Sequence, residues 1–273
     1  MQWVWHNGLF VLQGQPLFTA ANRSFKWGDG LFETATFYKG RLLLAAFHFE
    51  RLFEGARLLQ MHSSFSEEQL TNAITDLCEK NSCSALARVR IALYRDDANA
   101  GSCVIEATAL PEETAQWSET GWRVVLYPFA RKSCDVFANL KSANYLPYIM
   151  AARYATETGA DESLVLNTHN RICDGSKTNV FLLSGTNVYT PALSEGCVAG
   201  VMRRYVLQEL KRLGYAVHQQ AVTEPMVQEA DCVFVTNAIE GLRWVQQFGD
   251  KTYGYGDLKK LYHELFSARY ATV

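Results

Sequence analysis

The sequence predicts a two-domain protein of the α+β or mixed α/β class. At 273 residues, the chain is long enough for two modest domains with normally buried cores. Strand-like segments outnumber helical ones, and they lack the strict alternation with helices that is typical of a doubly wound sheet. A polar segment at residues 111–120, PEETAQWSET, divides the chain. We therefore expect a smaller α+β domain at 1–112, a linker at 113–121 and a larger domain at 122–273.

The first domain is predicted to start with two hairpins and to continue with helices and strands. A glycine-containing break in residues 6–18 and a Lys39–Gly40 turn between two apolar runs indicate the hairpins. Residues 48–61 then follow a three-to-four spacing, which predicts an amphipathic helix. Ser66 followed by acidic residues is typical of a second helix start. Residues 86–95 and 102–110 are expected to be strands.

The second domain is predicted to begin with a strand at 122–130 and a helix at about 144–158. A strand at 162–167 and a hairpin at 171–191 follow. The remaining expectations are a helix at 200–214, a strand at 216–222, a short acidic helix, a strand at 232–238 and a terminal helix. The order supports a mixed architecture.

Composition excludes several classes of function. The formal net charge of −2 gives no electrostatic reason to expect a nucleic acid or an anionic membrane as partner. No apolar run approaches the roughly 18–20 residues that span a bilayer, and no signal peptide is visible at the start. The seven cysteines form no CxxC pair and no metal-ligand spacing, so we expect no metal site and a cytoplasmic protein with reduced thiols.

Lys141 is the first candidate for chemistry. It lies in LKSANY, just before a predicted helix, and next to Asn144 and Tyr145. A lysine amine is nucleophilic when burial or a nearby cation lowers its pKa, and such amines form Schiff bases with carbonyl groups and with pyridoxal phosphate. A solvated surface lysine is the commoner explanation of a lone lysine, so Lys141 needs support from elsewhere in the chain.

That support comes from groups that a pyridoxal phosphate site requires. Asp174, in ICDGSKTNVF, could keep the ring nitrogen protonated, although an ordinary Asp-Gly turn also explains it. A phosphate needs donors: the backbone N–H groups at a helix start, the guanidinium of Arg51 and the polar end of a strand are suitable. The backbone donors are expected at Gly200, Val201, Met202, Thr236, Asn237 and Ala238. Each of these signals alone is weak.

Together, seven separated motifs resemble the class IV aminotransferases, which are pyridoxal phosphate enzymes of fold type IV. The motifs cover nearly the whole chain in order: GDGLFET, HFERL, LKSANY, ADESLVLN, DGSKTNVF, AGVMRR and VFVTNAIEGL. The resemblance implies a D-amino-acid aminotransferase-like fold, a cofactor in the cleft between the domains, and a homodimer. Trp3, Trp5 and Phe10 are candidates for the dimer contact, although core packing explains them equally well.

The resemblance also implies a role for each matching residue. Lys141 is similar to the Schiff-base lysine, Arg51 to the phosphate arginine and Tyr145 to the tyrosine that contacts O3′ of the cofactor. Residues 200–202 and 236–238 match the two phosphate-binding segments. Two departures stand out. Asp174 replaces the usual glutamate with one methylene less reach, and Met202 stands where aminotransferases often have threonine.

The sequence favours aminodeoxychorismate lyase slightly over the aminotransferases. Thr34 in GLFET, together with AGVMRR and TNAIEGL, resembles the lyases, which release pyruvate and form 4-aminobenzoate for folate synthesis. The loop in LYRDDANAGS departs from the lyase pattern, and Arg95 within it is a candidate for binding a substrate carboxylate. A branched-chain or D-amino-acid aminotransferase is the alternative. A non-catalytic paralogue is disfavoured because Lys141, Asp174 and Arg51 are all present.

Overall fold

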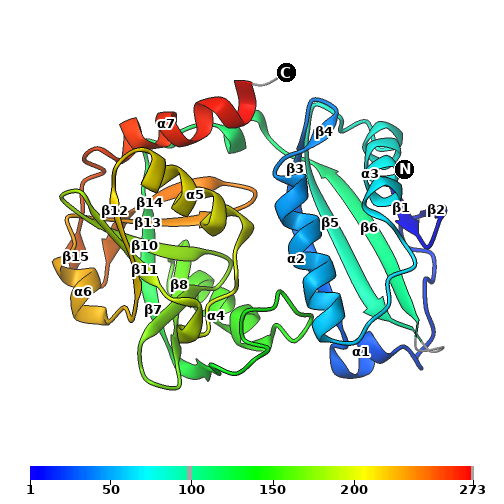
Figure 1. Cartoon of the computed structure of the whole chain (residues 1–273), viewed down its shortest axis with the longest axis horizontal. Helices are drawn as coiled ribbons and strands as arrows, with labels where there is room; N and C mark the ends of the chain where they lie inside the picture. The colour runs from blue at the N-terminus through cyan, green and yellow to red at the C-terminus, as the bar shows by residue number, and fades with distance from the viewer. Residues whose placement is uncertain (97–99, 272–273) are drawn as a thin grey trace. The chain divides into compact units, whose positions relative to one another are not determined.

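The computed structural model describes residues 1–96 and 100–271, with side chains described as far as Phe266 in the last helix. The chain forms two compact units (Figure 1). The first comprises Met1–Thr114 and the short segment Lys141–Asn144, and the second comprises Ala115–Leu140 and the chain from Tyr145 onward. Residues from Ala115 belong to the second unit because the ring of Trp117 packs against Tyr255 and Tyr262. No helix within the described residues is long and apolar enough to span a membrane.

The first unit is a six-stranded antiparallel sheet with helices on one face. The strand order is β2-β1-β6-β5-β3-β4. Its elements are β1 (Trp3–His6), β2 (Leu9–Leu12), α1 (Arg23–Trp27), β3 (Gly30–Tyr38), β4 (Arg41–Leu42), α2 (Ala45–Leu58), α3 (Glu67–Lys80), β5 (Leu86–Arg95) and β6 (Gly101–Ala109). The 3-10 helix η1 (Glu112–Ala115) follows the last strand.

Alternation along the central strands creates a buried face and a polar face. Glu33, Ala35 and Phe37 of β3 are buried, and β5 places Val89 and Ile91 beside them. Because successive strand residues point to opposite sides, this buried face is the one covered by helices, with α2 packed on β3 and α3 on β1 and β6. The helix start predicted at Ser66 is confirmed by a capping box with Gln69.

The second unit contains a nine-stranded mixed sheet. The order is β12-β11-β10-β13-β14-β7-β8-β9, with β15 paired to β14. Its strands are β7 (Trp122–Lys132), β8 (Glu162–Asn167), β9 (Ile172–Gly175), β10 (Asn179–Ser184), β11 (Asn187–Pro191), β12 (Ala216–Gln220), β13 (Cys232–Asn237), β14 (Gly241–Phe248) and β15 (Lys251–Thr252). Its helices are α4 (Leu146–Glu157), η2 (Leu193–Glu195), α5 (Val201–Arg212), α6 (Glu224–Glu229) and α7 (Leu258–Ala271).

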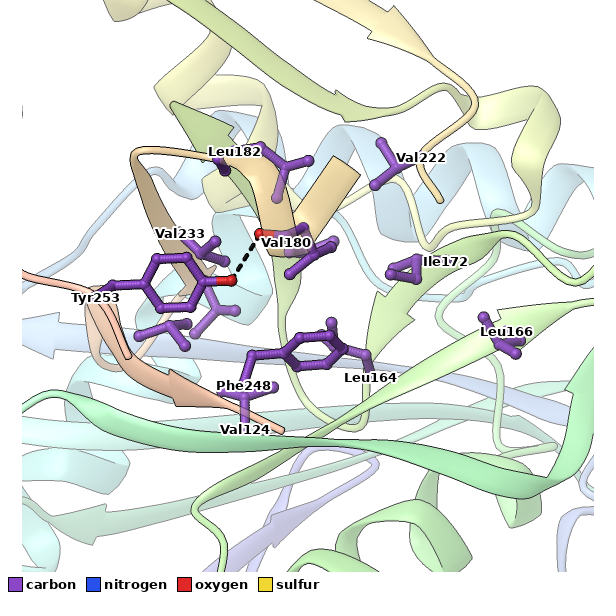
Figure 2. Packing of buried hydrophobic residues seen from close by; sticks show 14 residues of the cluster. Val124, Leu164, Leu166, Ile172, Val180, Leu182, Val222, Val233, Phe248 and Tyr253 are labelled. Carbon is purple, nitrogen blue, oxygen red and sulfur yellow. Dashed lines mark hydrogen bonds between the residues drawn. The ribbon is translucent and has the colours of Figure 1, made fainter. Parts of the chain in front are cut away.

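A cluster of aliphatic side chains fills the second unit between β7, β8, β10, β13 and β14 (Figure 2). Val180 and Leu164 are fully buried in it, and Phe248 is nearly so. Tyr253 lies at its edge, where its hydroxyl donates to the carbonyl oxygen of Val227 at 2.6 Å (Figure 2). Burial of these side chains is the main stabilising contribution to the sheet that carries the candidate site.

The structure differs from the sequence expectations in several elements. The first hairpin turns at Asn7–Gly8, both with positive φ, and residues 16–18 form no strand. The apolar run after Lys39–Gly40 gives a strand of only two residues, because α2 already begins at Ala45. The helix expected at 144–158 spans Leu146–Glu157. A short apolar run has no period that separates strand from helix, which explains the error after Gly40.

Candidate active site

The segment that carries Lys141 is attached to the start of β3. The amide N–H of Phe32 donates to the carbonyl oxygen of Lys141 at 2.9 Å, and that of Ala143 donates to Gly30 at 2.8 Å. An isolated bridge pairs Leu31 with Ser142. The backbone of the candidate lysine is therefore fixed to β3, although the two segments are far apart in the sequence.

Cationic groups gather around Phe32 on the polar face of the sheet. The Lys141 ammonium lies 4.6 Å from the centroid of the Phe32 ring, and the Arg90 guanidinium lies 5.0 Å from the same centroid. Both distances are in the range of cation–π contacts. Thr34 lies two residues beyond Phe32 on the same face and is paired in register with Arg90. This face thus brings Lys141, Thr34 and Arg90 together.

Arg90 is a residue that the sequence analysis did not assign. Burial lowers its pKa, and Glu106, 3.5 Å away, opposes that effect. The alternating strand LARVRIALYR placed Arg88 and Arg90 on one side of a strand. The pairing of β5 with β3 shows that Arg90 lies on the same sheet face as Phe32, the residue that the Lys141 ammonium contacts.

Arg51, the expected phosphate ligand, forms an ion pair with Glu33 on the helix-covered face. Its Nε donates to Glu33 Oε1 at 2.7 Å and its Nη2 to Glu33 Oε2 at 2.5 Å, while His48 Nδ1 lies 2.6 Å from Oε2. Burial alone would raise the pKa of Glu33, but the charge of Arg51 and the contact with His48 outweigh it and lower the pKa to about 2. The guanidinium is 14% exposed.

Arg95, the expected substrate-carboxylate residue, is the last residue of β5 and contacts the chain just after the end of α2. Its Nε donates to Asp29 at 3.0 Å, and its other nitrogens donate to the carbonyl oxygens of Leu59 and Gln60 at 2.6 and 3.1 Å. These contacts anchor the strand end to the helix end. The loop that departs from the lyase pattern includes residues 97–99, which lie outside the described part of the chain.

Asp174 is the buried acidic centre of the second unit. It is 1% exposed at the end of β9, where Oδ1 accepts from Asn179 Nδ2 at 2.7 Å. Oδ2 accepts from the Tyr148 hydroxyl and from the Val198 amide N–H, both at 2.7 Å. The Lys132 ammonium lies 3.6 Å from Oδ2. A carboxylate in this setting is fixed in position, which is what recognition of a ring nitrogen requires.

Tyr145 lies beside this centre. Its ring stacks on that of Tyr148 at 4.5 Å, and its hydroxyl donates to the carbonyl oxygen of Ser176 at 3.3 Å. The Asp-Gly turn therefore carries both the acid and a contact to the candidate O3′ tyrosine.

Glu162 holds the turn that follows Asp174, and the sequence analysis did not assign it. Its carboxylate accepts from the amide N–H groups of Ser163 and Ser176 at 2.7 and 2.8 Å. It also accepts from the hydroxyls of Ser176 at 2.5 Å and Thr178 at 2.8 Å. A Cβ on Gly175 would clash with Thr178 and Glu162, so this position requires glycine. The signal in the sequence was an acid at the start of an otherwise apolar strand.

The start of α5 has the properties of an anion site. Gly200 is the N-cap residue, and no side chain caps the helix there. A Cβ on Gly200 would lie 1.9 Å from Asn179 Oδ1, so only glycine fits. The side chains of Val201 and Met202 are buried, and their N–H groups belong to the first turn, where the helix dipole favours negative charge.

The end of β13 lies next to this helix start through strand pairing. Thr236 is in register with Asn179, whose Nδ2 also donates to the carbonyl oxygen of Val198 at 3.0 Å. The Thr236 hydroxyl is buried and has no hydrogen-bond partner among the described residues. Asn237 forms a turn by accepting from the N–H groups of Ile239 and Glu240. An uncapped helix start and an unpartnered hydroxyl fit a phosphate group.

Comparisons with known proteins agree with this geometry. The family model described as "Amino-transferase class IV" matches residues 30–248, so the chain belongs to that family. It is similar to the aminodeoxychorismate lyase of Vibrio harveyi, with 27% identity over 87% of this chain and 88% of that protein. It is also similar to the branched-chain-amino-acid aminotransferase of Pseudomonas aeruginosa, with 22% identity over 97% of this chain and 93% of that protein.

A solved structure shows the same fold. It is a hypothetical aminotransferase from Mycobacterium tuberculosis in a PLP-bound form, with a TM-score of 0.87, 17% identity, and coverage of 99% of both chains. The predicted family and fold type are confirmed. The prediction of a pyridoxal phosphate enzyme of the class IV family is confirmed with them.

Proposed function

We propose that this enzyme is an aminodeoxychorismate lyase, which releases pyruvate from 4-amino-4-deoxychorismate and forms 4-aminobenzoate for folate synthesis. The observation that carries the proposal is the half-buried Thr34 on the sheet face of Phe32, whose ring contacts the Lys141 ammonium. A hydroxyl on the lysine's face can relay a proton to the leaving group, which elimination needs and transamination does not.

We propose that pyridoxal phosphate is attached at Lys141, where the bound cofactor supplies an electron sink. Asp174 would face its ring nitrogen and Tyr145 its O3′ atom. Its phosphate would be held by Arg51 and by the donors at Gly200, Val201, Met202, Thr236, Asn237 and Ala238. The uncapped start of α5 and the unpartnered hydroxyl of Thr236 support this assignment.

A substrate carboxylate requires a cation, and we propose two. Arg95 is the residue expected from the sequence, but its donors already bind Asp29 and two carbonyl oxygens. Arg90 shares the Phe32 ring with Lys141, which favours it as the principal contact. Replacement of Arg90 should therefore raise KM more than replacement of Arg95.

A class IV aminotransferase acting on branched-chain or D-amino acids is the second candidate. The similarity to the Pseudomonas aeruginosa aminotransferase, which extends over 97% of this chain, favours it. In that case Thr34 would be only a β-branched strand residue, and its replacement would have little effect on turnover.

The test starts with the purified enzyme loaded with pyridoxal phosphate. Borohydride reduction and peptide mapping should label Lys141 in the wild type, and the same labelled peptide should persist in the matched control Lys177→Ala. Pyruvate release from aminodeoxychorismate, without keto-acid formation from amino acids, would identify the lyase. Keto acid from L-leucine or D-alanine would identify an aminotransferase instead.

Thr34→Val separates the two candidates further. In a lyase that uses the hydroxyl, kcat for pyruvate release should fall by about 100-fold or more. Thr108→Val, an exposed hydroxyl on β6 of the same sheet, is the control and should leave kcat unchanged. An unchanged rate in Thr34→Val would remove the main support for the lyase.

We also propose a homodimer and a cytoplasmic location. Leu146, Ile149 and Met150 form an exposed apolar stripe at helical spacing on α4. The exposed Phe129 packs its ring against Tyr154 of the same helix. Trp5 is buried in the first unit and contributes to the core. Light scattering of the wild type and of Ile149→Glu tests the dimer.

A further inference from the structure

A second lysine lies beside the buried carboxylate. Lys132, at the end of β7, has its ammonium 3.6 Å from Asp174 Oδ2, and it donates to the carbonyl oxygen of Ala138 at 2.6 Å. The same ammonium lies 5.1 Å from the ring centroid of Tyr148. Its side chain is only 11% exposed. An ammonium withdrawn this far from water needs a negative partner, and Asp174 provides one.

The hydrogen bonds around Asp174 fit a carboxylate and not a carboxylic acid. The Val198 amide N–H, the Asn179 amide group at Nδ2 and the Lys132 ammonium can only donate, and the Tyr148 hydroxyl lies 2.7 Å away. A proton on Oδ2, the oxygen that faces the Val198 N–H and the Lys132 ammonium, would meet one of these donors. Oδ1 accepts from Asn179 and retains a second acceptor position.

Opposing influences act on this acid. Burial raises the pKa of Asp174 above its ordinary value, and the Lys132 charge is the largest influence that opposes this rise. The other titratable groups facing the acid are the phenol of Tyr148 and the thiols of Cys173 and Cys197, whose pKa values are all raised, first by burial. These three groups are therefore neutral near pH 7, and among the described residues Lys132 is the cation that forms an ion pair with the acid.

We infer that Lys132 is a positioning residue that keeps the buried Asp174 ionised at neutral pH, so that Oδ1 can accept from a protonated ring nitrogen. The inference rests on the proposed function for the role of Asp174 toward the cofactor, and it deepens that role. It also gives a reason why a buried aspartate suffices here: the acid is held in both charge and position before any ligand binds.

The experiment is infrared difference spectroscopy of the cofactor-free enzyme labelled with carbon-13 aspartate. Asp174→Asn supplies the blank, so the difference spectrum isolates the Asp174 carboxyl group. At pH 7 the wild type should lack the carbonyl stretch of a protonated acid, whereas Lys132→Met should show it. Because a cation at this distance lowers a carboxyl pKa by about 1–3 units, the titration midpoint in Lys132→Met should rise by at least about one pH unit, a tenfold change in acid dissociation.

Lys132→Arg retains the charge and should leave Asp174 ionised at pH 7, as in the wild type. If the lysine had a purely steric role, this agreement would not be expected. A protonated Asp174 in the wild type at pH 7, or an ionised one in Lys132→Met, would overturn the inference. If Lys132→Met does not fold, Lys132→Gln and the wild-type spectrum decide it. The infrared experiment uses the cofactor-free enzyme, so its failure is separate from failure of the proposed function. The borohydride labelling of Lys141 in the loaded enzyme tests that function.

Discussion

Replacing Glu33 by glutamine should destabilise the first unit in a strongly pH-dependent way. In the folded protein, Arg51 and His48 outweigh burial and lower the pKa of Glu33 from its ordinary value of 4.5 to about 2. Each pKa unit corresponds to about 1.4 kcal/mol, so the carboxylate contributes about 3 kcal/mol at neutral pH. Glutamine keeps the shape of the side chain but removes the charge, and this contribution is lost.

The sign of the pH dependence follows from the lowered pKa. The contribution of Glu33 is fully present above about pH 4.5 and disappears as the pH falls through about 2, with about 1.4 kcal/mol left near pH 3. Urea unfolding of the wild type and Glu33→Gln at pH 7 and pH 3, followed by tryptophan fluorescence, measures both differences. Glu54→Gln, on the helix α2 that carries Arg51 and His48, is the control, because its ion pair with Arg57 is exposed and worth little. A difference below about 1 kcal/mol at pH 7, or one that does not shrink at pH 3, would refute the reasoning.

Two further predictions concern the second unit. Thr236→Val should leave the stability of the cofactor-free protein unchanged or slightly higher, since the hydroxyl has no hydrogen-bond partner in the described part of the chain, but should weaken pyridoxal phosphate binding by about tenfold. Calorimetry checks both values, and an unchanged affinity would remove Thr236 from the phosphate site. Glu162→Gln should cost about 1–3 kcal/mol, because both carboxylate oxygens accept from N–H groups and an amide N–H₂ in either orientation would face at least one such donor, those of Ser163 and Ser176 or that of Lys177. Faster hydrogen exchange at residues 175–178 would accompany that loss, and exchange as slow as in the wild type would contradict it.

Elements whose signals are local were the ones that could be predicted from the sequence. The start of α3 depends on Ser66 and Gln69, which are three residues apart, and the strand at 162–167 was predicted with its observed bounds. The strand β14 (Gly241–Phe248) was missed because its exposed positions break the apolar run. The helix α1 has only five residues, which is too short for a periodic pattern.

The candidate site divides in the same way. Lys141, Asp174 and Gly200 stand in motifs that can be read along the chain. The proposed roles of Arg90 and Lys132, by contrast, depend on strand pairing and burial. Arg90 needs the register of β3 with β5, and Lys132 needs the strand order β7-β8-β9, in which its ammonium comes within 3.6 Å of Asp174 on β9. Neither relation can be inferred from a single sequence, because many registers are compatible with the same alternation.

The Asp-Gly turn shows why residues that are weak signals singly form a site together. Asp174 accepts from the Val198 N–H, and Asn179 donates to both Asp174 and the Val198 carbonyl oxygen. Val198 lies two residues before Gly200, the N-cap of α5. The backbone of Val198 therefore connects the Asp174 carboxylate to the helix start. A substitution of Asp174 therefore changes more than one charge. Asp174→Ala also removes the acceptor that fixes Val198, and a loss of phosphate affinity in that variant would be a mechanical consequence of this connection.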